Sequence, residues 1–334
     1  PIGRALAIMA HRRRIPSIAT QRGLIGNELG FLPVFASRLA VHGHDEEQFY
    51  MDRGVPKHQI YVTGHPRFDS FRTTPPGDRQ SVLGKYGVKP EHKTVLAVTN
   101  QIRDMEAWSA YIHKLAKYPD VVVLIKPHRN EVVNNKLDDY YRLAKAHPNV
   151  KVLAGTSDQI KRILPHVDAA VTELSTAGLE AMVCGVPTLF LRKPSYDDIN
   201  HNYYYEKMDE FVSTDPEYLA RLTWAVLKQQ IIRRHNLDKI KAFLTHAYPV
   251  ELSGEALTRV ISRLTGKIIR RPVARKYEGM LVKGSKPEIF HVRGLVKRHV
   301  ISPQAMLKHG FSPQHVVRIP DEELEQIPPG SFIS

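Results

Sequence analysis

The stretch Val171–Leu191, V-T-E-L-S-T-A-G-L-E-A-M-V-C-G-V-P-T-L-F-L, decides the fold of this chain. Its pattern predicts a buried strand, a turn of small hydroxyl residues, a short helix and a second buried strand. Either Ser175 or Thr176 takes the N-cap position of the helix, and Gly185 ends it. A strand followed directly by a helix and a second strand is typical of a parallel α/β sheet.

The turn before this helix is a candidate phosphate site. A helix N-terminus exposes unpaired backbone N–H groups and a partial positive charge, which together favour a phosphate. We expect Ser175 and Thr176 to bind phosphate oxygens of a nucleotide, and Glu180, one turn further on, to bind ribose hydroxyls. The alternative is an ordinary turn with a capping serine and a solvated glutamate.

The strand and helix alternation extends on both sides of this stretch and predicts a parallel doubly wound sheet. Polar residues follow the ends of three of its strands: Thr99, Lys126 to His128, and Thr172 to Thr176. Because ligands of such sheets bind at the carboxyl ends of the strands, we expect these residues to share one cleft. The predicted strands cover residues 95–99, 121–126, 150–153, 169–172 and 188–191, and helices are expected at 216–230, 231–246 and 254–264.

The first 74 residues predict part of a second Rossmann-like domain. A helix precedes a strand at 15–19, and a strand at 39–42, a helix at 45–53 and a strand at 60–63 follow. A complete domain of this kind would need about 100 more residues. Turn residues at Gly64, Pro66 and 75–77 mark a link. We therefore expect three parts: a partial N-terminal domain (1–74), a nucleotide-donor domain (75–268), and a basic linker with a small α+β module (269–334).

Composition indicates a globular protein of two or more domains. The 334 residues are 42% hydrophobic and 25% charged, and no apolar run reaches the length of a membrane span. The single cysteine, Cys184, fits a reducing cytoplasm and is expected to be a small buried thiol rather than a nucleophile. We expect a cytoplasmic protein, peripheral at the inner face of the membrane.

The net charge of +14 implies an acidic partner. Between Arg270 and Arg298 there are nine basic residues against Glu278 and Glu288, which gives half of the total excess. Such a segment favours an anionic membrane surface or a charged polymer. A solvated linker is the alternative, and no nucleic-acid recognition motif accompanies the charge.

Several motifs, in their order along the chain, resemble those of the bacterial CDP-glycerol glycerophosphotransferases. They are Q-R-G at 21–23, T-G-H-P-R-F-D at 63–69, K-P-H at 126–128 and T-E-L-S-T-A-G-L-E at 172–180. These enzymes belong to a wider set of surface-carbohydrate transferases with the GT-B fold of two Rossmann-like domains. The resemblance spans residues 15–191 and lies in the combination of motifs.

The resemblance implies a donor linked to CDP, CMP or UDP and a polymer or lipid-linked acceptor in the cell envelope. It implies no cofactor and a metal-independent reaction, which is also expected because the adjacent acidic pairs 138–139 and 197–198 read as surface loops. His128 and Arg22 are the candidate catalytic residues. The candidate donor-binding residues are Gly64, Arg67, Thr99, Lys126, Ser175, Thr176 and Glu180.

Two departures from the family pattern concern catalysis. Family members carry a histidine where this chain has Arg22, and a second proline where it has Arg129. Arginine cannot act as a base at ordinary pH, so the base is sought among His42, His44 and His65 or in a segment outside the chain. Arg67 and Asp69 could equally form a structural ion pair at the hinge.

Two other functions stay open. Sugar-nucleotide 2-epimerases share the fold, and their S-G-G-x-x-E-E turn is similar to residues 175–180. The third reading is a non-catalytic nucleotide-binding envelope protein. Residues 279–330 predict strands at 280–282, 288–292 and 294–301 and a helix with a serine cap after Ile301. They resemble short modules appended to bacterial envelope proteins.

Overall fold

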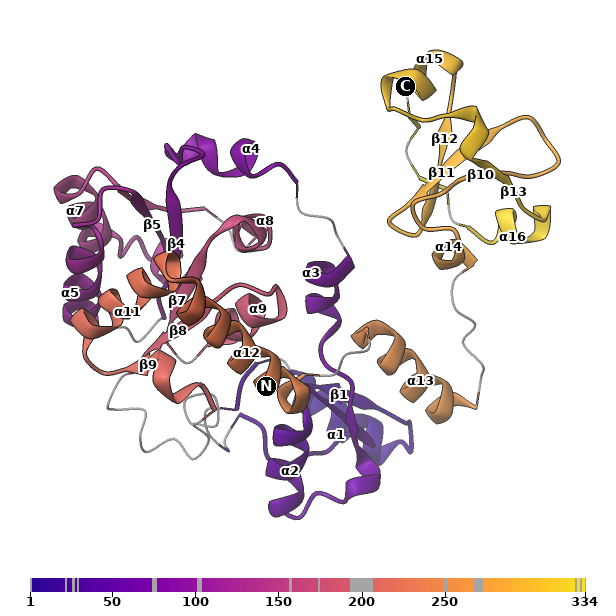
Figure 1. Cartoon of the computed structure of the whole chain (residues 1–334). Coiled ribbons are helices and arrows are strands. Elements are labelled where there is room, and N and C mark those ends of the chain that lie inside the picture. The colour runs from indigo at the N-terminus through magenta and orange to yellow at the C-terminus, as the bar shows by residue number, and fades with distance from the viewer. Residues whose placement is uncertain are drawn as a thin grey trace. The chain divides into compact units, whose positions relative to one another are not determined.

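The computed structural model divides the chain into two compact units, Pro1–Leu264 and Thr265–Ser334. Among the residues that the structure describes, no helix is both long and apolar enough to cross a membrane. Figure 1 shows the elements of each unit. The described residues are 2–21, 23–25, 28, 30–73, 77–100, 104–155, 158–173, 175–192, 207–248, 252–266, 273–327, 329–330 and 332–333.

The larger sheet of the first unit has six parallel strands in the order β6-β5-β4-β7-β8-β9. This order reverses between β4 and β7, which is the switch point of a doubly wound sheet. The predicted parallel doubly wound sheet is therefore confirmed. Its strands are β4 (Lys93–Val98), β5 (Val121–Lys126), β6 (Val150–Val152), β7 (Ala169–Thr172), β8 (Thr188–Leu191) and β9 (Val212–Ser213).

Helices cover both faces of this sheet because its strands are apolar on both sides. In β5, Val121, Val123 and Ile125 pack into one core. Val122 and Leu124 pack into a second core on the opposite face. The first core includes side chains of α5 (Met105–Leu115), α7 (Asp138–Ala146), α11 (Pro216–Lys228) and α12 (Gln230–Ala247), and the second those of α4 (Arg79–Leu83) and α8 (Asp158–Ile163) (Figure 1).

The smaller sheet of the first unit has three parallel strands in the order β1-β2-β3. The predicted strand at 15–19 was wrong in its bounds: Arg14 has a positive φ of 56°, Ile15 is exposed, and the strand begins only at Ile18. The elements are α1 (Ile2–Arg12), β1 (Ile18–Thr20), β2 (Arg38–Val41), α2 (His44–Asp52), η1 (Lys57–Gln59), β3 (Ile60–Val62), η2 (Pro66–Phe68) and α3 (Asp69–Thr73). We call residues 2–73 the N-terminal lobe and residues 77–248 the C-terminal lobe.

The end of α12 joins the two lobes. The Tyr248 hydroxyl accepts a hydrogen bond from the His65 backbone N–H (2.8 Å) and lies 2.9 Å from the His65 carbonyl oxygen. Lys207 pairs with Asp45 at 2.8 Å. The Asp69 carboxylate accepts hydrogen bonds from Ser253 and Gly254 at the start of α13 (Ser253–Thr265). The N-terminal lobe is therefore fixed to residues that come about 180 positions later.

The second unit is built on a mixed four-stranded sheet in the order β12-β11-β10-β13. The three predicted strands are present as an antiparallel set, but the sequence interpretation missed β13, which pairs in parallel with β10. Ser302 caps α15 by accepting from Ala305 N–H, as predicted. The elements are α14 (Val273–Lys276), β10 (Leu281–Lys283), β11 (Ile289–Arg293), β12 (Val296–Val300), α15 (Pro303–Lys308), η7 (Pro313–His315), β13 (Val316–Arg318) and α16 (Asp321–Glu325).

Candidate functional site

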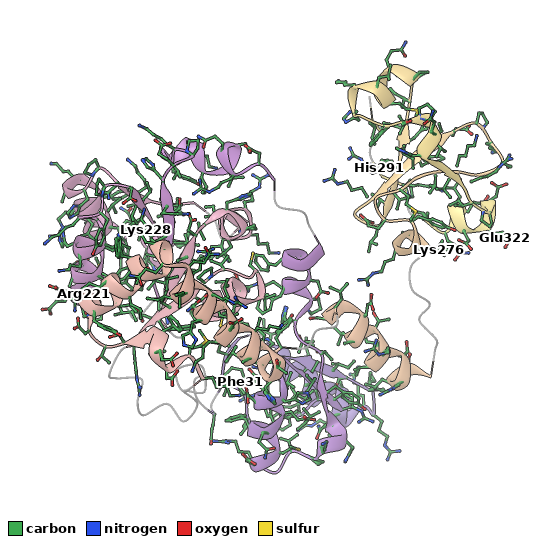
Figure 2. All side chains as sticks on the ribbon, viewed as in Figure 1. Phe31, Arg221, Lys228, Lys276, His291 and Glu322 are labelled. Atoms are coloured by element: carbon green, nitrogen blue, oxygen red, sulfur yellow. The ribbon has the colours of Figure 1, made fainter. Side chains whose placement is uncertain are left out.

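A cleft of about 1090 Å³ lies at the carboxyl ends of β4, β5 and β7, where both lobes contribute walls. From the N-terminal lobe come Thr20, Gln21, Leu24 and Phe31, the last labelled in Figure 2. The C-terminal lobe provides an apolar part with Val132, Val133 and Ile160. Seven of the predicted site residues line the same cleft: Arg67, Thr99, Lys126, His128, Ser175, Thr176 and Glu180.

The turn after β7 opens helix α9 (Thr176–Val183), and Ser175 is its N-cap. The Ser175 hydroxyl accepts a hydrogen bond from Ala177 N–H at 3.3 Å and lies 3.0 Å from the Thr172 hydroxyl. Thr176 is the first helical residue, so the structure decides between the two caps that the sequence left open. Leu174 lies outside the described residues. Both hydroxyl residues line the cleft at a helix N-terminus, the arrangement that suits an anion.

Gly178 allows α9 to lie close to the sheet. A Cβ atom at this position would come within 2.8 Å of the Phe190 ring of β8 and 3.2 Å of Thr172. No side chain fits this gap without displacing a buried ring, so the close approach of α9 to β7 and β8 depends on this glycine. The glycine thereby sets where the N-terminus of α9 meets the cleft.

Glu180 is almost fully buried and its carboxylate forms an ion pair with Arg67, which extends from η2 of the other lobe. Asp69, the other residue proposed for a hinge ion pair, instead caps α13 through two backbone N–H groups at 2.9 Å. The ion pair at this border therefore runs between the lobes. Ribose binding by Glu180 stays a prediction, and it would require this carboxylate to share or exchange its partner.

His128 is the N-cap of the short helix α6 (Arg129–Val133). Its Nδ1 atom accepts a hydrogen bond from Asn130 N–H at 3.2 Å. An acceptor at Nδ1 places the proton of the neutral ring on Nε2, so the ring has one N–H donor to offer. Since His128 lines the cleft, this donor is available to a bound anion.

Lys126 ends β5 and is buried. Its Nζ donates to the carbonyl of Gly155 at 2.8 Å, and burial lowers the pKa of the amine. This lysine thus joins the end of β5 to the loop after β6, two segments that both line the cleft. Lys126 was predicted as a donor-binding residue, and this hydrogen bond shows that it also holds the loop after β6.

The two remaining predicted site residues are not among those that line the cleft. Gly64 lies elsewhere in the structure, and Arg22 is outside the described residues. Gly64 is absent from the residues that line the cleft; it has a positive φ of 68°, and a Cβ atom there would come within 2.4 Å of the Ser253 hydroxyl. Its place is in the contact of the N-terminal lobe with Tyr248 and Ser253. Arg22 lies outside the described residues, as does the acidic pair 197–198.

The three histidines considered as bases are all absent from the cleft lining. His42 is fully buried, with Nε2 3.2 Å from the Gln21 carbonyl oxygen, and burial lowers its pKa to about 4. His44 is exposed and pairs with Glu47. The Nδ1 of His65 accepts from Arg67 N–H at 3.1 Å. The base therefore stays unassigned.

The sequence interpretation missed Glu131 and Tyr140. Both are buried, and Glu131 accepts hydrogen bonds from His128 N–H, Thr99 and Tyr140. A signal was present, because H-x-x-E before an apolar residue has the spacing of a capping box. Among the described residues there is no group of three or more histidine, cysteine, aspartate or glutamate side chains arranged to hold a metal ion.

No protein-family model matches the sequence, and no curated protein matches it. Solved structures do. A putative UDP-N-acetylglucosamine 2-epimerase from Listeria monocytogenes is 15% identical with a TM-score of 0.60, over 79% of this chain and 72% of that chain. The wall teichoic acid polymerase TagF is 15% identical with a TM-score of 0.56, over 77% and 68%. Anabaena HepE, in complex with UDP and glucose, is 16% identical with a TM-score of 0.52, over 77% and 74%.

At these identities the likeness shows the fold. The expected GT-B-like arrangement of two α/β lobes is confirmed, with a six-stranded and a three-stranded parallel sheet. Membership of the glycerophosphotransferase family stays a prediction.

Proposed function

We propose that this protein transfers a glycosyl or glycerophosphoryl group from a nucleotide-activated donor, linked to CDP, CMP or UDP, to an envelope acceptor. The acceptor class is a polysaccharide, a teichoic-acid-like polymer or a lipid-linked saccharide. One observation carries the proposal: the N-terminus of α9, Arg67 and His128 all line one cleft between the lobes. In an open α/β sheet this crevice at the switch point is where nucleotides bind.

The chemistry that these groups support is stabilisation of a departing nucleotide. The bond between the transferred group and a donor phosphate oxygen breaks, and negative charge develops on that oxygen. Backbone N–H groups at the start of α9, the Arg67 guanidinium and the Nε2–H of His128 would offset this charge. The new bond forms to an acceptor hydroxyl oxygen, whose proton passes to a base that stays unassigned.

The neighbours support a nucleotide-linked donor. The structure of Anabaena HepE contains UDP and glucose. The Listeria protein is named as a putative UDP-N-acetylglucosamine 2-epimerase, and TagF as a wall teichoic acid polymerase. An enzyme that uses such donors would act in the cytoplasm. We propose that it sits at the inner face of the membrane, where a lipid-linked acceptor is presented.

A 2-epimerase is the second candidate, because the Listeria neighbour is named as a putative 2-epimerase and has a higher TM-score than TagF, 0.60 against 0.56. Nucleotide binding without catalysis is the third, since the sequence has Arg22 where the family places a histidine. The three differ in what they release. A transferase frees nucleotide only with an acceptor, an epimerase changes the sugar nucleotide without one, and a binding protein does neither.

The deciding experiment starts with binding. Thermal shifts with CMP, CDP, UDP and GDP identify the base, and CDP-glycerol, UDP-glucose and UDP-N-acetylglucosamine then test the linked group. Release of nucleotide that depends on added envelope glycan or lipid-linked saccharide supports transfer. A panel with no stabilising nucleotide contradicts all three candidates.

A further inference from the structure

Glu131 is an acidic residue in an unusual place. It lies on α6, 3% exposed, between the ends of β4 and β5. Its carboxylate accepts three hydrogen bonds, from His128 N–H at 3.0 Å, the Thr99 hydroxyl at 3.2 Å and the Tyr140 hydroxyl at 3.1 Å. The Tyr140 hydroxyl oxygen also lies 2.8 Å from the Thr99 hydroxyl oxygen, so its single proton can go to either of these two acceptors. These contacts connect four residues, and two of them, Thr99 and His128, line the cleft.

The members of this set come from separate parts of the chain. Thr99 follows β4, His128 and Glu131 belong to the loop and helix after β5, and Tyr140 comes from α7. Tyr140 is fully buried and packs in the core between α7 and the sheet. The set therefore fixes two neighbouring cleft loops to the core beneath them.

Packing alone does not account for a carboxylate here. A buried ionised group costs much desolvation energy, and an apolar side chain of similar size would stabilise the fold at least as well. Buried polar networks whose members are all satisfied instead specify one arrangement of the groups that they join. The groups joined here are the backbone of His128 and the side chain of Thr99.

Holding the His128 backbone also holds its ring. Glu131 and the ring act as the two halves of one cap, because the carboxylate accepts from His128 N–H while Nδ1 accepts from Asn130 N–H. The second bond keeps the ring proton on Nε2, the nitrogen left for a ligand. If the backbone of His128 moves, the ring loses its hydrogen bond from Asn130 N–H. Both the orientation of the ring and its tautomer can then change.

We propose that Glu131 and Tyr140 are positioning residues, which hold His128 with its Nε2–H directed to a bound phosphate and Thr99 beside it. The part of this inference that concerns phosphate rests on the proposed function. The part that concerns the ring and backbone of His128 does not, and the two can fail separately.

The test uses the full chain and four variants. Glu131→Ala removes the carboxylate, Glu131→Gln keeps an acceptor of the same shape, and Tyr140→Phe removes only a hydroxyl. Tyr111→Phe is the matched control, because Tyr111 is also fully buried and donates one hydrogen bond, to Thr223 at 3.2 Å, in the α5–α11 contact. Histidine labelled with ¹⁵N reports which ring nitrogen of His128 is protonated, and hydrogen exchange reports its backbone N–H.

In the unmodified protein we expect a ring protonated on Nε2 and a protected His128 N–H. Glu131→Ala should speed exchange of that N–H at least about tenfold and mix the ring tautomers. Tyr140→Phe should give a smaller change in the same direction, and Glu131→Gln should restore most of the protection. Tyr111→Phe should leave both signals unchanged. If Glu131→Ala fails to fold, Tyr140→Phe decides.

Steady-state kinetics provide a second test of the positioning role. For any donor of the panel that is turned over, Glu131→Ala should lower kcat about 30-fold and change KM less than about threefold, because an aligned Nε2–H matters most as charge develops. Unchanged exchange and tautomer in both Glu131→Ala and Tyr140→Phe would overturn the positioning role. Changed NMR signals together with no nucleotide binding by the unmodified protein would leave positioning intact and overturn the proposed function.

Discussion

Arg67 and Glu180 form an ion pair that crosses the cleft, with a half-exposed guanidinium on one lobe and a buried carboxylate on the other. The side chain of Arg67 is 46% exposed and that of Glu180 is 4% exposed. The two partners are therefore unequal, because removing the arginine leaves a buried charge alone while removing the carboxylate leaves a solvated cation.

Because the two partners are unequal, we expect a second substitution at Glu180 to restore part of the stability that is lost when Arg67 is removed. Arg67→Ala should lower the free energy of unfolding by about 1–3 kcal/mol, and adding Glu180→Gln should recover part of that loss. Chemical unfolding of the two single variants and the double variant measures it. Lys228→Ala removes one half of an exposed pair with Asp120 (Figure 2) and should change stability by less than about 0.5 kcal/mol. A double variant less stable than Arg67→Ala alone would contradict this account.

The hydroxyls at the start of α9 should contribute to nucleotide affinity. Ser175→Ala with Thr176→Ala is expected to weaken diphosphate binding by about 1.5 to 3 kcal/mol, because hydrogen bonds to a charged group are lost while the backbone N–H groups remain. Calorimetry with CDP or UDP measures the change. Equal affinity in a folded double variant would show that the hydroxyls act only as a cap.

His128→Ala should lower turnover more than it raises the donor KM. A donor at Nε2 that offsets charge on the leaving phosphate acts mainly in the transition state. Steady-state kinetics with the donor that the thermal shifts select provide the test. Full turnover with a change in KM alone would make His128 a ground-state binding residue.

His42 should make stability depend on pH. Burial, with a smaller contribution from His65, lowers its pKa from 6.5 to about 4. His42 is therefore protonated below about pH 6.5 in the unfolded chain, but only below about pH 4 in the folded chain. The stabilisation is complete above pH 6.5 and falls by about 3 kcal/mol as the pH drops to 4. The difference in pH dependence between the protein and His42→Gln, measured by urea unfolding, isolates this group; parallel curves would contradict it.

The basic segment should bind anionic membranes. Removing residues 270–334 is expected to abolish sedimentation with phosphatidylglycerol vesicles, and raising the salt concentration should do the same by screening. Nucleotide binding should persist, because the cleft residues all precede this segment. Arg270 and Arg271 lie outside the described residues. Binding that survives both truncation and salt would rule out the docking role.

The sequence predicted best those parts whose signal is local. Strands β5, β7 and β8 have the predicted bounds because buried parallel strands are continuous apolar runs. The two-residue β9 and the exposed β13 carry no such pattern and were missed.

The candidate site follows the same rule. The motifs predicted which residues meet in the cleft, since strand ends converge at one edge of the sheet. Their partners could not be predicted: Lys126 bonds to a carbonyl 29 positions away, and Glu131 to Thr99 over 32 positions. Such pairs depend on tertiary packing. Gly64 was predicted as a donor-binding residue because it lies in the T-G-H-P-R-F-D motif. In the structure it packs instead against Ser253.

The bonds of Tyr248 to His65, 183 positions earlier, have a consequence for how the protein is made. The ribosome delivers the N-terminal lobe well before the residues that hold it in place, Tyr248 and Ser253. At 5–20 residues per second this lag is roughly 10 to 40 s. During that time the short strands that the structure describes in this lobe, β1, β2 and β3, must avoid pairing their edges with other chains. The contact that fixes the N-terminal lobe to the end of α12 can therefore form only after translation has passed Tyr248.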